Sequence, residues 1–199
     1  MVKKQKNHRI SILDAAQGSV LSKGFAATRI DEVCSIARVT KGSFYHHFES
    51  KDALAEALID HYFQEVARAF SSGAWKLEKD PKVRLIGFLT NAVKVAGGPL
   101  LQRGCLLGSF ALDLSQTHPN IQSEVDTRFG ALSQLLKPLI QDATDKKITP
   151  KPPSAMLLAQ QFVAVLQGAV ILAKSSGDQS KAAMSVRCYK KMLEATLQL

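Results

Sequence analysis

Cysteine is scarce in this chain of 199 residues. The three cysteines are Cys34, Cys105 and Cys188; they lie far apart, and no Cys-x-x-Cys pair occurs. An odd number of widely spaced cysteines does not make a disulfide framework, and it lacks the paired spacing of a zinc–cysteine cluster. We therefore expect a protein of a reducing compartment and predict a cytoplasmic location.

Long hydrophobic runs are lacking as well. The N-terminal stretch MVKKQKNHRISIL holds no apolar run of signal-peptide length. The longest apolar region, residues 155–173, is interrupted by Gln160, Gln161, Gln167 and Gly168. This interruption favours a buried helix over a membrane span, so we expect no membrane partner.

Acidic residues are outnumbered, with 17 Asp and Glu against 26 Lys and Arg, a formal net charge of +9. The excess is uneven, because residues 1–51 hold nine basic and four acidic residues, a net charge of +5. A basic N-terminal quarter on an otherwise average chain indicates a polyanionic partner, most often nucleic acid. A plain solvated basic surface is the alternative.

Internal repeats and strand-type alternation are absent, and helical periodicity dominates. Thr28 and Asp31 have the spacing of a helix N-cap and its first-turn acid. Gly24 is a stop signal before them, and Ser50 and Asp80-Pro81 are start signals after them. The sequence therefore predicts an all-α protein of about nine helices, near residues 9–23, 28–37, 41–47, 51–72, 81–96, 104–115, 118–142, 154–174 and 180–197, with a loop at 142–154.

The second and third predicted helices are short and separated by the three residues 38–40, which is the outline of a helix-turn-helix. In that motif the second helix enters the major groove of DNA. On a helical wheel Phe44 and Phe48 fall close together, so we expect them to pack inward. The opposite face then presents Gly42, Ser43, His46 and His47, with Lys41 and Tyr45 on its flank.

Each residue of this outward face suits a contact with DNA. Gly42 and Ser43 let the backbones approach, and Lys41 can reach guanine acceptors. Tyr45 and His47 suit phosphate contacts. Helix N-termini favour anions, so phosphate contacts are also expected where the second and fourth helices begin. The predicted DNA-binding set is Thr28, Arg29, Thr40, Lys41, Gly42, Ser43, Tyr45, His46, His47 and Lys51.

Paired histidines also raise the question of metal binding or catalysis. Neighbouring helical residues point about 100° apart, so His46 and His47 cannot share an ion. The remaining histidines, His8, His61 and His118, supply no cluster in the sequence. Because a catalytic histidine needs a nucleophile and an orienting group in a pocket, we expect no enzyme activity, no metal and no cofactor.

The stretch FAATRIDEVCSIARVTKGSFYHHFESKDAL resembles the DNA-binding domain of the TetR family of bacterial regulators. The resemblance extends over residues 9–60, in the order and spacing of the predicted helices. The resemblance implies an all-helical homodimer with a helix-turn-helix DNA-binding domain at residues 1–50 and a ligand-binding and dimerisation domain at residues 51–199. One position departs from the family, since Arg38 stands where glycine is usual. A left-handed conformation there costs on the order of 1 kcal/mol.

The C-terminal part of the chain is rich in apolar helices. Residues 155–173 are apolar on nearly all sides, so a helix there must be buried all round. One chain does not offer enough apolar surface to bury it. The last helix has an apolar stripe of Ala182, Val186, Tyr189, Leu193 and Leu197. We therefore predict a homodimer through the last two helices, with an ordinary monomeric core as the alternative.

The family resemblance also implies an effector pocket. Its candidate lining consists of apolar and aromatic residues, which in general form plain core more often than a pocket wall: Phe88, Ala92, Leu106, Phe110, Phe129, Phe162 and Leu166. Such a lining suits a small, largely apolar effector.

The stretch RGCLLGSFALDLS resembles one in a TetR subgroup whose members respond to electrophiles or acyl compounds, which makes Cys105 a candidate sensor. A nearby arginine and a helix start favour the thiolate, whereas a buried packing cysteine is the alternative. The resulting hypothesis is a repressor released from a palindromic operator by a small molecule. The alternatives are a redox-sensing repressor acting through Cys105 and an effector-independent DNA-organising protein.

Overall fold

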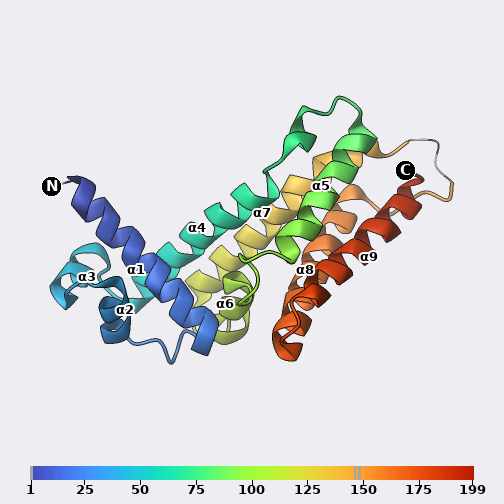
Figure 1. The fold of residues 1–199 in the computed structure, drawn as a ribbon. Coiled ribbons are helices and arrows are strands. Elements are labelled where there is room, and N and C mark those ends of the chain that lie inside the picture. Colours follow the sequence, from blue (N-terminus) through green and yellow to red (C-terminus); the bar gives the residue numbers. More distant parts are fainter. Residues whose placement is uncertain (1, 146, 148) are drawn as a thin grey trace. The chain divides into compact units, whose positions relative to one another are not determined.

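The computed structural model describes residues 2–145, 147 and 149–199, and the side chains from residue 8 onward within these ranges. This part of the chain holds nine α-helices, one short 3-10 helix and no strand (Figure 1). The all-α prediction is therefore confirmed. The elements are α1 (Val2–Lys23), α2 (Ile30–Ala37), α3 (Lys41–His47), α4 (Lys51–Phe70), η1 (Ala74–Leu77), α5 (Pro81–Ala96), α6 (Leu106–Leu114), α7 (Pro119–Ala143), α8 (Ala155–Ser176) and α9 (Ser180–Leu197).

Local capping explains where several helices begin. The Asp80 carboxylate accepts hydrogen bonds from the amides of Lys82 and Val83, with Pro81 in the first turn of α5. The Ser50 hydroxyl accepts from the Ala53 amide at 3.0 Å at the start of α4. These starts agree with the sequence prediction. The loop before α8 also lies where it was predicted, although its positions 146 and 148 are outside the described residues.

The predicted cap of the second helix is wrong. The N-cap residue of α2 is Arg29, and no side chain caps this end. Thr28 is buried instead, and its hydroxyl donates a hydrogen bond to the Gly24 carbonyl at 2.8 Å. Burial therefore removes from the surface the hydroxyl that we had expected to contact a phosphate.

The chain divides into two compact units that do not follow simple sequence order. The first unit contains residues 1–65 and 105–126, and the second contains residues 66–104 and 127–199. Within the first unit α1 packs with α2, α3 and α6, and the Phe25 and Phe110 rings meet edge to face at 5.5 Å. The predicted functional division near residue 50 is a separate matter and stays a prediction.

In the second unit α9 packs along α5 and α8 (Figure 1). Its core is aromatic: Phe162 contacts the rings of Phe70, Phe88 and Tyr189 at centroid distances of 5.9, 6.2 and 5.5 Å. The Tyr189 hydroxyl donates a buried hydrogen bond to the Leu158 carbonyl at 2.6 Å. This bond ties α9 to α8.

The packing of α9 corrects one sequence inference. The stripe expected to face a partner chain is buried inside this chain, with Ala182, Val186 and Leu197 wholly covered and Tyr189 and Leu193 nearly so. The exposed face of α9 is a different one, and it carries Met184, Cys188 and Met192. Cys188 is therefore an exposed thiol.

Helix α8 keeps an exposed apolar face too, with Leu157, Ile171 and Leu172 each more than half exposed. By length and composition alone α8 could cross a membrane, with a mean hydropathy of 1.8 in its most apolar window. The core helix of a soluble protein meets the same criterion. Its other face is buried through Phe162, Leu166 and Ala169, so it serves as a core helix here.

Candidate DNA-binding surface

The turn between α2 and α3 contains an arginine whose backbone is in the left-handed conformation. Arg38 has φ 54° and ψ 45°, and its amide and that of Val39 bond to carbonyls in the last turn of α2. The Thr40 hydroxyl then accepts from the Ser43 amide at 3.1 Å and caps α3. Thr40 therefore positions the helix, and Arg38 adopts the left-handed conformation whose cost was considered above.

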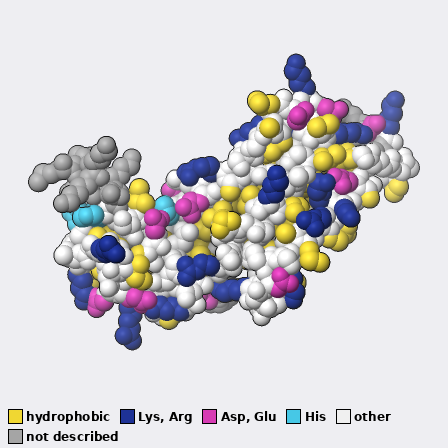
Figure 2. All heavy atoms as spheres, in the orientation of Figure 1, with side chains coloured by type: hydrophobic (Ala, Val, Ile, Leu, Met, Phe, Trp, Pro, Cys, Tyr) yellow, Lys and Arg dark blue, Asp and Glu magenta, His cyan; other side chains and the backbone are white. Residues whose placement is uncertain are grey.

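Helix α3 is divided into two faces, as the helical wheel predicts. Phe44 and Phe48 are buried, and their rings lie 5.6 Å apart. Tyr45 is 53% exposed, and Lys41, Gly42 and His46 are also exposed. The buried rings fix α3 to the first unit while the polar face remains open. Figure 2 shows Lys, Arg and His side chains on the surface of this part of the molecule.

Gly42 has no packing role inside the chain. A Cβ added there would meet only the Thr40 hydroxyl, at an ordinary contact distance of 3.8 Å. Its φ is also not in the left-handed region that favours glycine. Neither packing nor backbone conformation therefore requires a glycine, and the open space lies toward solvent at the first turn of α3.

Two residues that the sequence did not single out join this surface from α1. His8 places Nδ1 3.4 Å from the Ser43 hydroxyl, and the Arg9 guanidinium lies 5.4 Å from the Phe48 ring centre. Burial lowers the pKa of His47, and the positive charges of His46, His8 and Arg9 lower it further. The surface therefore concentrates positive charge around α3. No local sequence pattern reveals this contact, because His8 precedes Ser43 by 35 residues.

The lysines predicted to contact DNA have partners in the structure. Lys41 forms an exposed ion pair with Asp31 at 2.6 Å, which an approaching phosphate or guanine can compete with. Lys51 is more constrained, because its ammonium donates to the Ala26 carbonyl at 3.2 Å and lies 4.4 Å from the Phe25 ring centre. Burial lowers the pKa of Lys51. Lys51 thus has a structural role within the chain, which the sequence analysis did not predict.

The predicted pocket residues are distributed over both units. Leu106 and Phe110 belong to the first unit, whereas Phe88, Ala92, Phe129, Phe162 and Leu166 belong to the second. All are buried except Phe129, which is partly exposed. A separate cavity of about 400 Å³ lies between the end of α7 and the start of α8. Its lining includes Gln141, Asp145, Lys151 and Ser154 and none of the predicted residues.

Cys105 is the N-cap residue of α6 and is buried. It interacts with Tyr62 of α4, whose hydroxyl pKa is raised well above its usual value, first by burial and then by Cys105. Cys34 is also buried, and burial raises its pKa. Both cysteines are therefore packed residues, and the Cys105 thiol lies beside the titratable hydroxyl of Tyr62.

A short two-helix motif with a polar face on its second helix, carried on an all-helical chain, defines a helix-turn-helix DNA-binding regulator. Residues 12–58 match the family described as bacterial regulatory proteins, tetR family. Residues 81–189 match the tetracyclin repressor-like C-terminal domain. The chain belongs to the TetR family of transcriptional regulators. It is a DNA-binding regulator and not an enzyme.

Relatives support the assignment. The repressor DhaR of Mycobacterium sp. (strain GP1) is 27% identical over 154 residues, 77% of this chain and 76% of DhaR. The repressor NemR of Escherichia coli K12 is 23% identical over 172 residues, 84% of each chain. The reduced form of E. coli NemR has the same fold with a TM-score of 0.74 over 92% of this chain and 96% of its own, at 21% identity. A TetR regulator of Chloroflexus aurantiacus J-10-fl gives a TM-score of 0.79 over 99% and 98%, at 23% identity.

Proposed function

We propose that this TetR-family regulator is a homodimeric, cytoplasmic repressor that binds a palindromic operator and is released by a small effector. The observation that carries the proposal is the open polar face of α3, held by the buried rings of Phe44 and Phe48. Gly42, Ser43 and Lys41 would read or approach the bases, whereas Arg29, Tyr45, His46 and His47 would contact phosphates. The buried Thr28 is not retained in this set.

The proposed dimer interface is the exposed apolar face of α8 and α9. Leu157, Ile171 and Leu172 on α8 and Met184 and Met192 on α9 are 55–59% exposed. Large apolar side chains gathered on two neighbouring helices mark an interaction surface. A second copy of the chain is the occupant that fits, because a helix-turn-helix reads two half-sites through a two-fold dimer.

The proposed effector site is the aromatic core of the second unit around Phe70, Phe88 and Phe162. The rings of Phe70 and Phe88 stack at 6.4 Å, and Phe162 meets both of them. Such a lining offers dispersion contacts and no charge, so it suits a small, largely apolar ligand. A DNA-organising protein without an effector would show operator affinity that no small molecule changes.

A redox or electrophile response through Cys105 is a second candidate. Its support is the interaction of Cys105 with Tyr62 and the likeness to NemR, of which a reduced form has been crystallised. Electrophile treatment of the full chain should then release DNA from the wild type and not from Cys105→Ser. Equal release from both would remove Cys105 as the sensor.

The main proposal is tested by equilibrium binding of the full chain to a selected operator and to random DNA, over a range of salt. Arg29→Ala should weaken binding to all sequences alike and reduce the salt slope by about one. Ser43→Ala should instead change the sequence preference. Lys79→Ala, at an exposed position before α5, is the matched charge control and should change neither. An unchanged salt slope in Arg29→Ala would contradict the phosphate assignment.

A further inference from the structure

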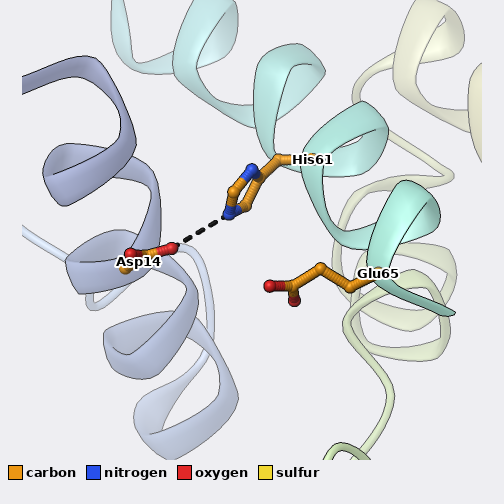
Figure 3. Close-up of side chains that lie close together, drawn as sticks. All are labelled: Asp14, His61 and Glu65. Atoms are coloured by element: carbon orange, nitrogen blue, oxygen red, sulfur yellow. Dashed lines mark hydrogen bonds and ion pairs between the residues drawn. The ribbon is translucent and has the colours of Figure 1, made fainter. Parts of the chain in front are cut away.

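Three side chains of metal-binding type lie close together in the first unit, on two different helices. Asp14 comes from α1, and His61 and Glu65 come from α4 (Figure 3). One ligand atom from each lies within 4.8 Å of the other two. Comparing histidines only with one another misses this group, because its other members are carboxylates and one of them is 47 residues away.

The contacts within this group keep the three side chains turned toward one another. His61 Nε2 and Asp14 Oδ1 are 2.9 Å apart. Gln17, one turn after Asp14 on α1, donates from Nε2 to Glu65 Oε2 at 3.3 Å. The Oε1 atom of Gln17 is buried and has no hydrogen-bond partner among the described residues. Gln17 therefore orients Glu65 and adds an unsatisfied oxygen beside the group.

We propose that Asp14, His61 and Glu65 bind a divalent transition-metal ion such as Zn²⁺. His61 and Glu65 are four residues apart on α4, so both side chains lie on one helix face. One imidazole and two carboxylates form a donor set that suits zinc and its neighbours, whereas magnesium and calcium prefer oxygen alone. None of the three residues belongs to the DNA-binding face of α3.

The geometry needs only a small adjustment to receive the ion. Zinc holds nitrogen and oxygen ligands at about 2.0–2.2 Å, so tetrahedral ligand atoms stand roughly 3.4 Å apart. The Asp14–His61 contact of 2.9 Å would open, and the widest separation, at most 4.8 Å, would close. Side-chain rotation alone supplies such shifts in partly exposed residues, and water completes the coordination.

The ion would link α1 to α4 within the first unit. Because α1 also packs against α2 and α3, zinc would stabilise the helices that carry the DNA-binding face. The competing explanation is an ordinary His61–Asp14 ion pair that needs no metal. The proposal does not depend on the dimer, the effector or the operator, so it can fail while they stand.

Zinc titration of the full chain by calorimetry tests the site. A Cys188→Ser background removes the exposed thiol as a competing ligand. We expect one zinc ion per chain, and we expect His61→Asn and Glu65→Gln each to weaken binding at least about tenfold. His118→Asn is the matched control, because His118 lies 3.7 Å from Asp52 in a pair that no third metal-binding side chain of the described residues joins. This control should bind zinc as the parent does.

Thermal unfolding with and without zinc separates ligand loss from misfolding. The parent and the control should unfold at a higher temperature in zinc, and His61→Asn and Glu65→Gln should fold but gain nothing from it. Zinc affinity that is unchanged in both variants would overturn the proposal. A parent chain that binds no zinc would overturn it as well. If His61→Asn were then also less stable than the parent, the group would be a plain ion pair.

Discussion

Packing within the chain does not explain the glycine at position 42, whereas the proposed contact with DNA does. The space beside its Cα is open, and its backbone conformation suits any residue. Gly42→Ala should therefore raise the free energy of unfolding by up to about 1 kcal/mol, because alanine favours the helix. The same methyl group should weaken DNA binding by on the order of 1 kcal/mol. Denaturant unfolding and DNA titration measure the two effects. Unchanged DNA affinity in Gly42→Ala would contradict a close approach of DNA to Gly42.

His47 should couple DNA binding to proton uptake. Burial and the neighbouring charges of His46, His8 and Arg9 hold its pKa below the ordinary 6.5, so the free protein favours the neutral ring. Protonation of His47 is therefore less favourable in the folded protein than in the unfolded chain. The folded protein keeps its full stability above that ordinary pKa and loses stability as the pH falls through the lower folded value. A DNA phosphate reverses the preference, because it stabilises the charged ring.

DNA affinity should therefore rise as the pH falls from about 7.5 toward 6, and His47→Gln should flatten this dependence. Titrations at several pH values measure the slope. His118→Gln removes a histidine just before α7, outside the α3 surface, and should leave the slope unchanged. An equal slope in His47→Gln and the parent would contradict a phosphate contact at His47.

At the scale of elements, local signals made several helix starts predictable. The starts of α4 and α5 follow from Ser50 and from Asp80 with Pro81, each of which acts within three residues. Thr28 has an equally good local pattern, but its hydroxyl bonds to the Gly24 carbonyl and is buried. Tertiary packing decides that outcome, so the local sequence cannot.

Which face of a helix is buried was harder to predict. Helix α9 has two apolar stripes, one containing Ala182 and Val186 and the other containing Met184 and Met192. Periodicity identifies both stripes and does not say which one meets the rest of the chain. The Asp14–His61 contact is unpredictable for a similar reason, because helix packing brings together residues distant in sequence.

The Tyr189 hydroxyl forms a polar link between α8 and α9, and its bond to the Leu158 carbonyl is buried. Tyr189→Phe removes the donor but keeps the ring against Phe162. The free energy of unfolding should fall by about 1 kcal/mol, the net value of one such bond. Denaturant unfolding measures this, and a loss near zero would mean that the bond contributes nothing net.

At the scale of the whole molecule, the exposed faces of α8 and α9 should hold two chains together. Met192→Glu places a charge in the proposed interface and should cost at least about 2 kcal/mol of association free energy. Leu77→Glu is the matched control, because Leu77 is 85% exposed on η1, outside α8 and α9. Sedimentation equilibrium should show monomers for Met192→Glu and dimers for the control. Dimers of equal strength in both would place the interface elsewhere.

The central claim is that two copies of the α3 surface read a two-fold symmetric operator. Selection of bound sequences from random DNA, followed by footprinting of the selected site, tests it most directly. The account predicts a palindrome whose half-sites lie on one side of the duplex, a whole number of helical turns apart, with two chains bound per site. Binding without preference for any palindrome over random DNA would contradict it.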